Sequence, residues 1–338
     1  MLAGRLLIAA ILVLLAMATP AAAEPFYKDK TIRILTSEAG SGYDTAARLV
    51  ARHLGAHIDG NPTVIVQAMP GATIKVPLYL YNVVPTDGTV IGILNNAAAF
   101  APLLGVPQAD FDPTRFNWLG SPSTEVGLVL VWHTVPVDTI ADATRREIVM
   151  GVGGGGSSAT FYGRLFNSVL GTKFKLVPGY AGMAEALLAM ERGETEGFPS
   201  TLLNSLNATK PDWLPEKKIK VLMQYGRNPS PELPGVPTAR DLAKTDEDRQ
   251  LIDAAAAPLD MGRPFAMAPD VAPENVRQLR AAMMATFVDP AFRADAKSLR
   301  FAVDAKPKSG EDLLAIVAEV YHAPKSLRDR LQTLYKQH

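Results

Sequence analysis

The stretch TIRILTSEAGSGYDTAARLVARHL, residues 31–54, decides the fold. Its first five residues are rich in β-branched side chains and predict a short strand. Residues 45–54 carry apolar side chains at helical spacing, and Asp44 is expected to cap this helix. A glycine-rich turn lies between the two. A strand that leads through such a turn into a helix predicts the start of a parallel βαβ unit.

A second unit of the same kind follows further along the chain. Residues 147–150 (EIVM) lead into the loop GVGGGGSSAT at residues 151–160 and then into an expected helix at residues 161–170. A glycine loop leaves backbone N–H groups unpaired at a helix N-terminus, where the helix dipole also favours negative charge. The two loops therefore predict two halves of one anion-binding site that face each other.

The N-terminus has the three regions of a secretory leader. Arg5 is followed by an apolar run at residues 6–18 and by alanines at residues 21–23, so cleavage is expected after Ala23. The run is shorter than the roughly 20 residues of a membrane-spanning helix, which disfavours an uncleaved anchor. The chain has no cysteine, which excludes disulfides, thiolate metal sites and a lipidated cysteine. We therefore expect an exported protein that resides in the periplasm.

Charge and length limit the class of protein further. Lys+Arg and Asp+Glu both number 34, and this balance disfavours a nucleic-acid or membrane-surface partner. The 338 residues predict about two domains. Strands and helices alternate in both halves, which predicts an α/β fold of two lobes, each a β-sheet flanked by helices and joined by two crossing segments. We place a signal peptide at residues 1–23, the first lobe at 24–128 plus 262–338, and the second lobe at 129–261.

The expected crossings lie at two strands. The strand at residues 127–132 leads into the second lobe, and the strand at residues 264–267 returns to the first. Prolines within residues 229–238 predict a rigid, irregular passage. Helices are expected to pack on the outside of the first lobe at residues 273–287, 290–298, 310–321 and 324–335.

The chain lacks a convincing catalytic or metal-binding pattern. Residues 151–156 satisfy G-x-G-x-x-G, but no acidic residue follows where a dinucleotide ribose would be held. His53 and His57 are spaced four apart on a helix, yet the glutamate of the zincin pattern is missing. The loop at 151–160 is thus either a structural turn or a small-anion cradle, and its pairing with the first loop favours the cradle. We expect no cofactor, no metal and no enzymatic activity.

The order of motifs resembles that of the periplasmic solute-binding proteins of tripartite tricarboxylate transporters, the Bug or TctC family. The resemblance implies a two-lobed type II binding protein, a monomer that closes over a small carboxylate and delivers it to integral-membrane transporter subunits. It covers nearly the whole mature chain, and it rests on TSEAGSGYD (36–44), MPGA (69–72), PTDGT (85–89), PGYAG (178–182) and ELPGVPT (232–238).

Departures from the family motifs leave the identity of the acid open among di- and tricarboxylates, amino acids and aromatic acids. Glu38 lies in the first loop, where its carboxylate must either turn away from a bound anion or bind a donor on the ligand. The loop at 153–160 is expected to be the purer carboxylate site. The predicted ligand-binding residues are Ser37, Glu38, Gly40, Ser41, Gly42, Tyr43, Asn95 and Asn96 in the first lobe, and Gly155, Gly156, Ser157, Ser158, Thr160, Tyr180, Ala181, Gly182 and Ser200 in the second.

Two alternative functions stay open at this point. A sensory receptor would bind the same ligand but dock on a signalling protein instead of a transporter. A periplasmic hydrolase would use Glu38 as a base, but the sequence offers no partnered nucleophile and no metal set to act with it.

Overall fold

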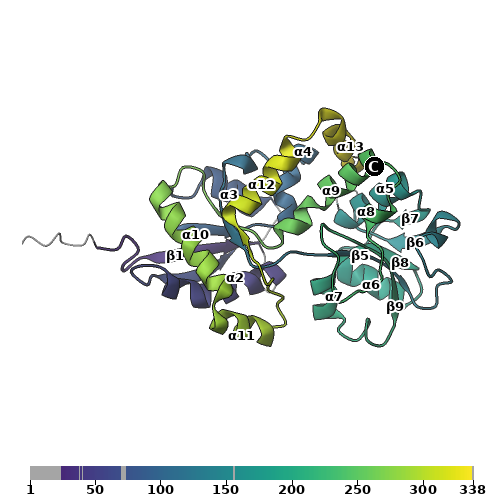
Figure 1. The fold of residues 1–338 in the computed structure, drawn as a ribbon, viewed down its shortest axis with the longest axis horizontal. Helices are drawn as coiled ribbons and strands as arrows, with labels where there is room; N and C mark the ends of the chain where they lie inside the picture. Colours follow the sequence, from purple (N-terminus) through teal and green to yellow (C-terminus); the bar gives the residue numbers. More distant parts are fainter. Residues whose placement is uncertain (1–23, 38, 40, 70–73, 155–156, 337–338) are drawn as a thin grey trace, which may run out of the picture.

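Two β-sheets, each flanked by helices, lie side by side in the computed structural model (Figure 1). The structure describes residues 24–37, 39, 41–69, 74–154 and 157–336. The first lobe contains β1 to β4, β10 and β11 with helices α2, α3 and α10 to α12, and the second contains β5 to β9 with helices α5 to α8. The predicted α/β fold of two lobes is confirmed.

The first sheet has six strands in the order β11-β4-β10-β3-β1-β2. Strand β1, next to the edge strand β2, pairs in parallel with both β2 and β3, as the alternation of strands and helices predicts, whereas β10 runs antiparallel between β3 and β4. The strands of this sheet are β1 (Thr31–Thr36), β2 (Thr63–Ala68), β3 (Val90–Ile93), β4 (Asn117–Ser121), β10 (Phe265–Met267) and β11 (Lys308–Ser309). The helices around it are α2 (Gly42–Leu54), α3 (Lys75–Asn82), α4 (Ala101–Leu104), α10 (Pro273–Val288), α11 (Pro290–Ser298), α12 (Gly310–Tyr321) and α13 (Lys325–Lys336), with short 3-10 turns η1 (Gly55–His57), η2 (Asn96–Phe100) and η3 (Pro113–Arg115).

The second sheet has five strands in the order β7-β6-β8-β5-β9. Strand β6 is parallel to β7 and β8, and β5 is antiparallel to β8 and β9. Its strands are β5 (Gly127–Trp132), β6 (Ile148–Gly151), β7 (Phe174–Val177), β8 (Gly197–Leu202) and β9 (Ile219–Tyr225). Its helices are α5 (Ser158–Leu170), α6 (Met183–Glu191), α7 (Leu203–Thr209), α8 (Ala239–Leu242) and α9 (Asp246–Met261), with the 3-10 turn η4 (Asp142–Thr144).

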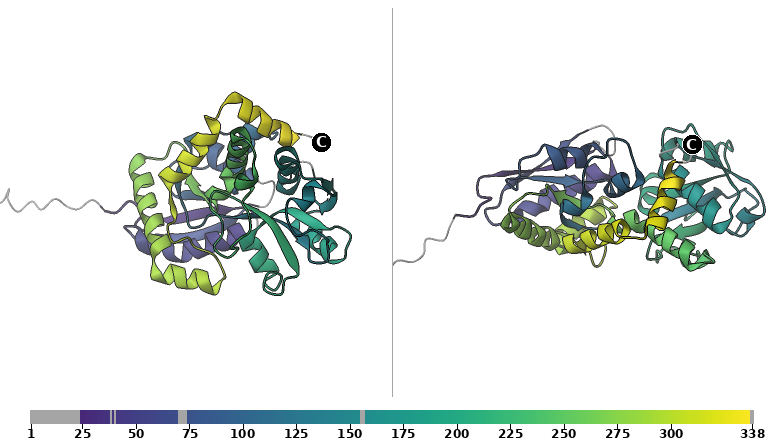
Figure 2. Two further views of the ribbon diagram at one scale, coloured as in Figure 1. Left: turned by 45° about the vertical axis from the view of Figure 1, so that its right-hand side comes forward. Right: turned by 90° about the horizontal axis from the view of Figure 1, so that it is seen from above.

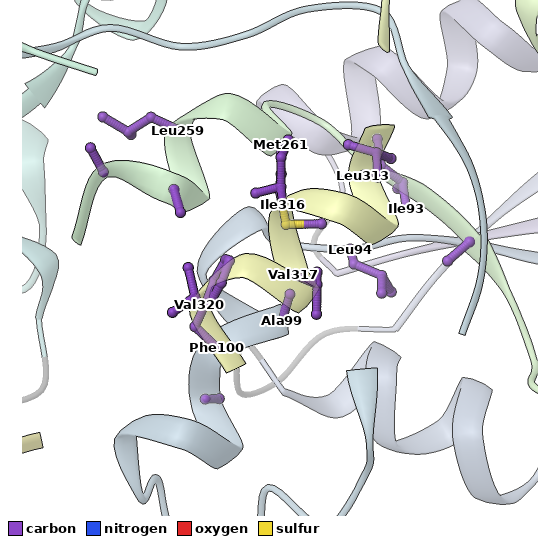
Figure 3. Packing of buried hydrophobic residues seen from close by; sticks show 14 of the residues in the cluster. Ile93, Leu94, Ala99, Phe100, Leu259, Met261, Leu313, Ile316, Val317 and Val320 are labelled. Carbon is purple, nitrogen blue, oxygen red and sulfur yellow. The ribbon is translucent and has the colours of Figure 1, made fainter. Parts of the chain in front are cut away.

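The hydrophobic core continues across the junction of the lobes (Figure 3). Leu259 and Met261 end helix α9 and are buried in the same cluster as Ile316 and Val317 of α12 and Phe100 of η2. The end of α9 therefore packs with the first lobe, although the sequence places residues 129–261 in the second. The residues at which one lobe gives way to the other stay a prediction.

Two segments cross between the sheets, one between β4 and β5 and one between α9 and β10. Gly262 has φ 56°, and a Cβ built on it would lie 1.7 Å from the carbonyl oxygen of Ser123 in the other segment. Only glycine allows this approach. Oγ of Ser121 accepts a hydrogen bond from the backbone N of Arg263 (3.0 Å) and donates to the Ser123 carbonyl (2.9 Å). The two crossing segments are thus tied to each other.

Helix α13 touches both lobes. Gln332 donates from Nε2 to the carbonyl of Leu103 in α4 (2.7 Å), and Arg164 of α5 donates from Nη1 to the carbonyl of Leu334 (3.4 Å). Figure 2 shows this helix, in yellow, ending beside the second lobe. The expectation that the C-terminal helices cover only the first lobe is therefore incomplete for α13. Among the residues that the structure describes, no helix has both the length and the apolar character that a bilayer crossing needs.

Candidate ligand-binding site

The predicted site residues lie mostly at one edge of each sheet. Because β1 and β3 are parallel, the loops that follow them leave the first sheet at the same edge. Strands β6 and β7 place their following loops together at an edge of the second sheet in the same way. Ligands of open α/β sheets bind at the carboxyl ends of parallel strands. The predictions for Glu38, Gly40, Gly155 and Gly156 fall outside the described residues.

The first loop ends in a serine cap. Helix α2 begins at Gly42, and Oγ of Ser41 accepts a hydrogen bond from the backbone N of Asp44 (3.1 Å). The prediction that Asp44 caps the helix is wrong, because Asp44 already lies in the first turn, where Nε of Arg48 donates to it (2.9 Å). Both serine and aspartate are good caps, and the helix starts one turn earlier than the apolar pattern indicates.

Tyr43 links the two loops of the first lobe. Its Oη accepts a hydrogen bond from the backbone N of Asn96 (3.1 Å), and burial raises the pKa of its phenol, so the phenol stays protonated. Oδ1 of Asn95 accepts from the backbone N of Ala97 (3.0 Å) and caps η2. Asn96 is 7% exposed, and its Nδ2 has no hydrogen-bond partner among the described residues. Asn96 thus offers an unused donor, whereas Asn95 is engaged in the turn.

The second loop repeats the serine cap of the first. Oγ of Ser157 accepts from the backbone N of Thr160 (3.2 Å) and lies 2.9 Å from its Oγ1. That Oγ1 also lies within donor distance of the carbonyls of Gly153 (3.2 Å) and Gly154 (3.1 Å). Thr160 is 4% exposed, so its hydroxyl holds the loop rather than facing solvent. Ser158 is exposed, and the backbone at the start of α5 keeps the anion-binding character of a helix N-terminus.

The third loop contacts the second. The backbone N of Tyr180 donates to the carbonyl of Val152 (3.3 Å), and a Cβ on Gly151 would lie 3.0 Å from the Tyr180 ring. Ala181 donates its backbone N–H to Oε2 of Glu185 (2.6 Å), so this amide is already paired with a carboxylate. Gly182 is exposed and precedes α6.

Ser200 lies within β8 rather than in a loop. Its Oγ accepts a hydrogen bond from Oη of Tyr225 (2.7 Å), and Tyr225 is so well shielded that burial raises its pKa well above the ordinary value. The Tyr225 ring covers Gly127, where a Cβ would lie 2.1 Å from Cζ. The Ser200 hydroxyl is therefore part of the packing on the sheet. The ligand-binding roles of all these residues stay predictions.

Sequence reasoning missed a buried charged group beside the first loop. Arg263 precedes β10, is 8% exposed, and places Nη1 3.0 Å from where a Cβ of Gly42 would be. Its guanidinium carbon lies 5.1 Å from the ring centroid of Tyr43 and 5.4 Å from that of Phe301. Nη2 lies 3.1 Å from Oε1 of Glu125. No sequence pattern marks this arginine, because only the return of the chain to the first sheet brings it to the loop.

Glu125 connects this cation to the second lobe. Its Oε2 accepts a hydrogen bond from Nδ2 of Asn204 in α7 (3.0 Å). Burial raises the pKa of the Glu125 carboxyl, and the charge of Arg263 opposes that rise. Asn204, Glu125 and Arg263 thus form a polar chain from one lobe to the other.

The two histidines of α2 and η1 do not share a site. Nε2 of His53 lies 3.1 Å from Asp295, while Nε2 of His57 lies 3.0 Å from Asp289. Within the described part of the chain, no group of three metal-ligating side chains comes together. Each histidine therefore pairs with its own aspartate at the surface, and the two rings do not converge on one site.

Comparison with known proteins rests on structure. No protein-family model and no curated protein matches the sequence. A TctC solute-binding protein from Polaromonas, solved without ligand, superposes with a TM-score of 0.69 at 21% identity over 91% of this chain and 98% of that one. This chain has the fold of the TctC solute-binding proteins. The family resemblance that the motifs predict is thus confirmed at the level of the fold.

Two further structures with this fold contain ligands. MatC from Rhodopseudomonas palustris, with bound malate, gives a TM-score of 0.62 at 18% identity over 91% of this chain and 99% of that chain. Another R. palustris protein, solved with adipate, gives a TM-score of 0.62 at 21% identity over 91% of this chain and 97% of that chain. Both ligands are small dicarboxylates.

Proposed function

We propose that this protein is a periplasmic receptor that captures a small organic acid between its lobes and delivers it to the membrane subunits of a tripartite tricarboxylate-type transporter. One observation carries the proposal. Helices α2 and α5 begin at the carboxyl edges of their sheets, and each start is ordered by a serine N-cap. Two such helix starts suit a ligand that carries negative charge.

The fold supports the same function. Structures with this fold include a TctC solute-binding protein and proteins that hold malate or adipate. We propose that the chain is exported, that its leader is cleaved after Ala23, and that it acts as a monomer. A micromolar ligand supplies about 8 kcal/mol, which is enough to shift an equilibrium between open and closed lobes that differ by a few kcal/mol.

The hydrogen bonds of the serine and threonine hydroxyls in the predicted site favour a binding role over a catalytic one. Ser157 and Thr160 bond to each other and to the loop, and Ser200 bonds to Tyr225. A serine nucleophile needs a base within hydrogen-bond reach, and these three side chains are engaged with other partners. We therefore propose that the loops hold the acid without changing it.

A thermal-shift screen of the mature chain against organic acids, amino acids and aromatic acids tests the proposal. A ligand at one hundred times its Kd stabilises the folded state by about 2.7 kcal/mol and raises the melting temperature. Ser157→Asp should abolish this rise, because aspartate is an equally good cap but adds a negative charge at the start of α5. The receptor role fails if no acid stabilises the wild-type protein.

Thr245→Asp is the matched control. Thr245 caps α9 in the same way, with Oγ1 accepting from the backbone N of Asp248 (3.1 Å). Its helix has 16 residues and is therefore about 24 Å long, with its other end at the crossing segment. Thr245→Asp should leave the ligand-induced shift unchanged. A shift that is equal in Ser157→Asp and in the control would overturn the assignment of the α5 loop.

A further inference from the structure

Arg263 lies beside the N-terminus of α2. Its Nη1 approaches Gly42, the exposed first residue of α2, and 10% of its side-chain surface remains open. Tyr43 and Phe301 both contact the guanidinium by cation–π interactions, with its central carbon 5.1 and 5.4 Å from the two ring centroids. The side chain is therefore fixed in position, with one edge at the helix start.

The burial of Arg263 is not explained by stability. Taking both charges of an ion pair out of water is costly, and apolar residues of similar size often serve the fold equally well. Here Oε1 of Glu125 lies 3.1 Å from Nη2, but the oxygen makes no well-formed hydrogen bond among the described residues. The pair thus leaves hydrogen-bonding capacity unused at the edge of the sheet.

Other buried polar groups at the same edge also lack partners. Nδ2 of Asn96, at the start of η2, has none among the described residues, and neither has Oγ1 of Thr36 at the end of β1. Both side chains are at least nine-tenths buried. Buried polar groups are nearly always paired in native proteins, so these two groups are candidate contacts for a ligand. Thr36 ends β1 and Asn96 follows β3, and Tyr43 joins the segments that follow these two strands.

The loops that follow β6 and β7 in the second lobe carry no comparable cation. Residues 151–163 and 177–191 contain neither lysine nor arginine. The hydroxyls of Ser157 and Thr160 are engaged inside their loop. These two loops can therefore meet an acid only without a cationic side chain, whereas Arg263 carries one beside α2. The expectation that the loop at 153–160 is the purer carboxylate site stays a prediction.

We propose that Arg263 is the residue that recognises the carboxylate of the ligand, with the amide of Asn96 beside it and Glu125 holding the guanidinium in place. This inference rests on the proposed function, because it concerns the same interlobe site. The positive end of α2 and the arginine act together on one carboxylate. The remainder of the acid then extends toward the uncharged loops of the second lobe.

Calorimetric titration with paired acids and amides tests the inference. The probes are malate, adipate and benzoate, each compared with malamide, adipamide or benzamide. The variant is the double substitution Arg263→Gln with Glu125→Gln, which replaces the ion pair by a neutral pair of similar size and keeps a partner for Asn204. Its folding is checked by circular dichroism and urea unfolding. The double variant should bind the acid at least tenfold more weakly and lose the preference for the acid over its amide.

Lys28→Gln is the matched control, because Lys28 precedes β1, at the amino edge of the same sheet, and its side chain is 50% exposed. It should keep the preference for the acid, and Arg263→Lys should keep part of it. The inference is overturned if the folded double variant retains the preference, or if acid and amide lose affinity equally, as a purely structural role requires. Failure of the wild-type protein to bind any acid would instead reject the proposed function.

Discussion

Nη2 of Arg263 lies 3.1 Å from Oε1 of Glu125, and only 10% and 1% of the two side chains are exposed. Glu125 lies in the segment that leaves the first sheet for the second, and Arg263 lies in the segment that returns. The ion pair therefore joins the two crossing segments on their buried side. Asn204 of α7 extends this contact into the second lobe.

Breaking this pair on one side should destabilise the protein strongly. Arg263→Gln leaves the Glu125 carboxylate buried without a compensating charge, and removal of one partner from a buried ion pair costs about 3–5 kcal/mol. The double variant with Glu125→Gln should recover most of that loss, because neither side then carries a charge. Urea unfolding of the single and double variants measures the coupling. Additive losses would show that the two side chains act independently.

An exposed ion pair serves as the comparison. Lys325 and Asp329 lie one turn apart on α13, with 80% and 53% of their side chains exposed. Exposed pairs contribute little because water and salt screen them. Lys325→Gln should therefore leave the midpoint of urea unfolding nearly unchanged. A large effect there would mean that loss of charge alone explains the result at Arg263.

Gly262 should tolerate no side chain. Gly262→Ala combines a φ of 56° with a Cβ that would lie 1.7 Å from the Ser123 carbonyl, so the crossing segments must separate. We expect a loss of about 4 kcal/mol or more, at the upper end for single substitutions. Gly193→Ala is the control, since Gly193 has φ 76° with nothing within 4 Å of its built Cβ. It should cost only the conformational term, about 1–2 kcal/mol. Equal losses in urea unfolding would contradict the steric argument.

The Thr160 hydroxyl should stabilise the loop that precedes α5. Thr160→Val removes the hydroxyl that reaches the carbonyls of Gly153 and Gly154 but keeps the branched side chain. The loss of a buried hydrogen bond should cost about 1–2 kcal/mol, and ligand affinity should fall because the backbone donors are less well ordered. Thr160→Ser restores the hydroxyl and should restore both properties. If Thr160→Val weakened binding with no change in stability, the hydroxyl would instead contact the ligand.

Much of the fold was predictable from local sequence. The strand at residues 127–132 and the helices at 290–298 and 310–321 have in the structure the bounds that their patterns predict. Each of these elements is set by the periodicity of its own side chains and by adjacent proline or glycine. Local pattern therefore suffices where an element packs one apolar face and ends at a clear signal.

The site was less predictable, because its contacts join distant parts of the chain. Arg263 reaches Tyr43 and Glu125 only after the chain returns to the first sheet. The sequence around Arg263 shows no motif that marks this contact. Thr160 illustrates a second limit, since its hydroxyl turns inward to loop carbonyls, and residue type alone does not show where a hydroxyl points.

Asp260 should make stability depend on pH between about 4 and 6. This carboxyl lies at the end of α9, is 4% exposed and pairs with Nε of Arg227. Nη2 of the same arginine lies 2.5 Å from Oε2 of Glu319 in α12. Burial raises the pKa of Asp260 to about 6; Arg227 and Lys308 lower it, while Glu319 and Asp253 raise it. The unfolded pKa is about 3.9. The folded state therefore binds the proton more tightly, and stability is lost as the pH rises from about 4 to about 6.

Asp260→Asn removes this loss because the amide cannot ionise. The pKa difference of about two units corresponds to about 3 kcal/mol, so the variant should match the wild type near pH 4 and exceed its stability at pH 7.5 by up to that amount. Arg227 keeps Glu319 as a partner in the variant. Urea unfolding at pH 4, 5, 6 and 7.5 measures the difference. Asp138→Asn, at a carboxylate that is 80% exposed and paired with Lys220, is the control and should show no such trend. Lower stability of Asp260→Asn at pH 7.5 would mean that attraction to Arg227 outweighs the cost of burial.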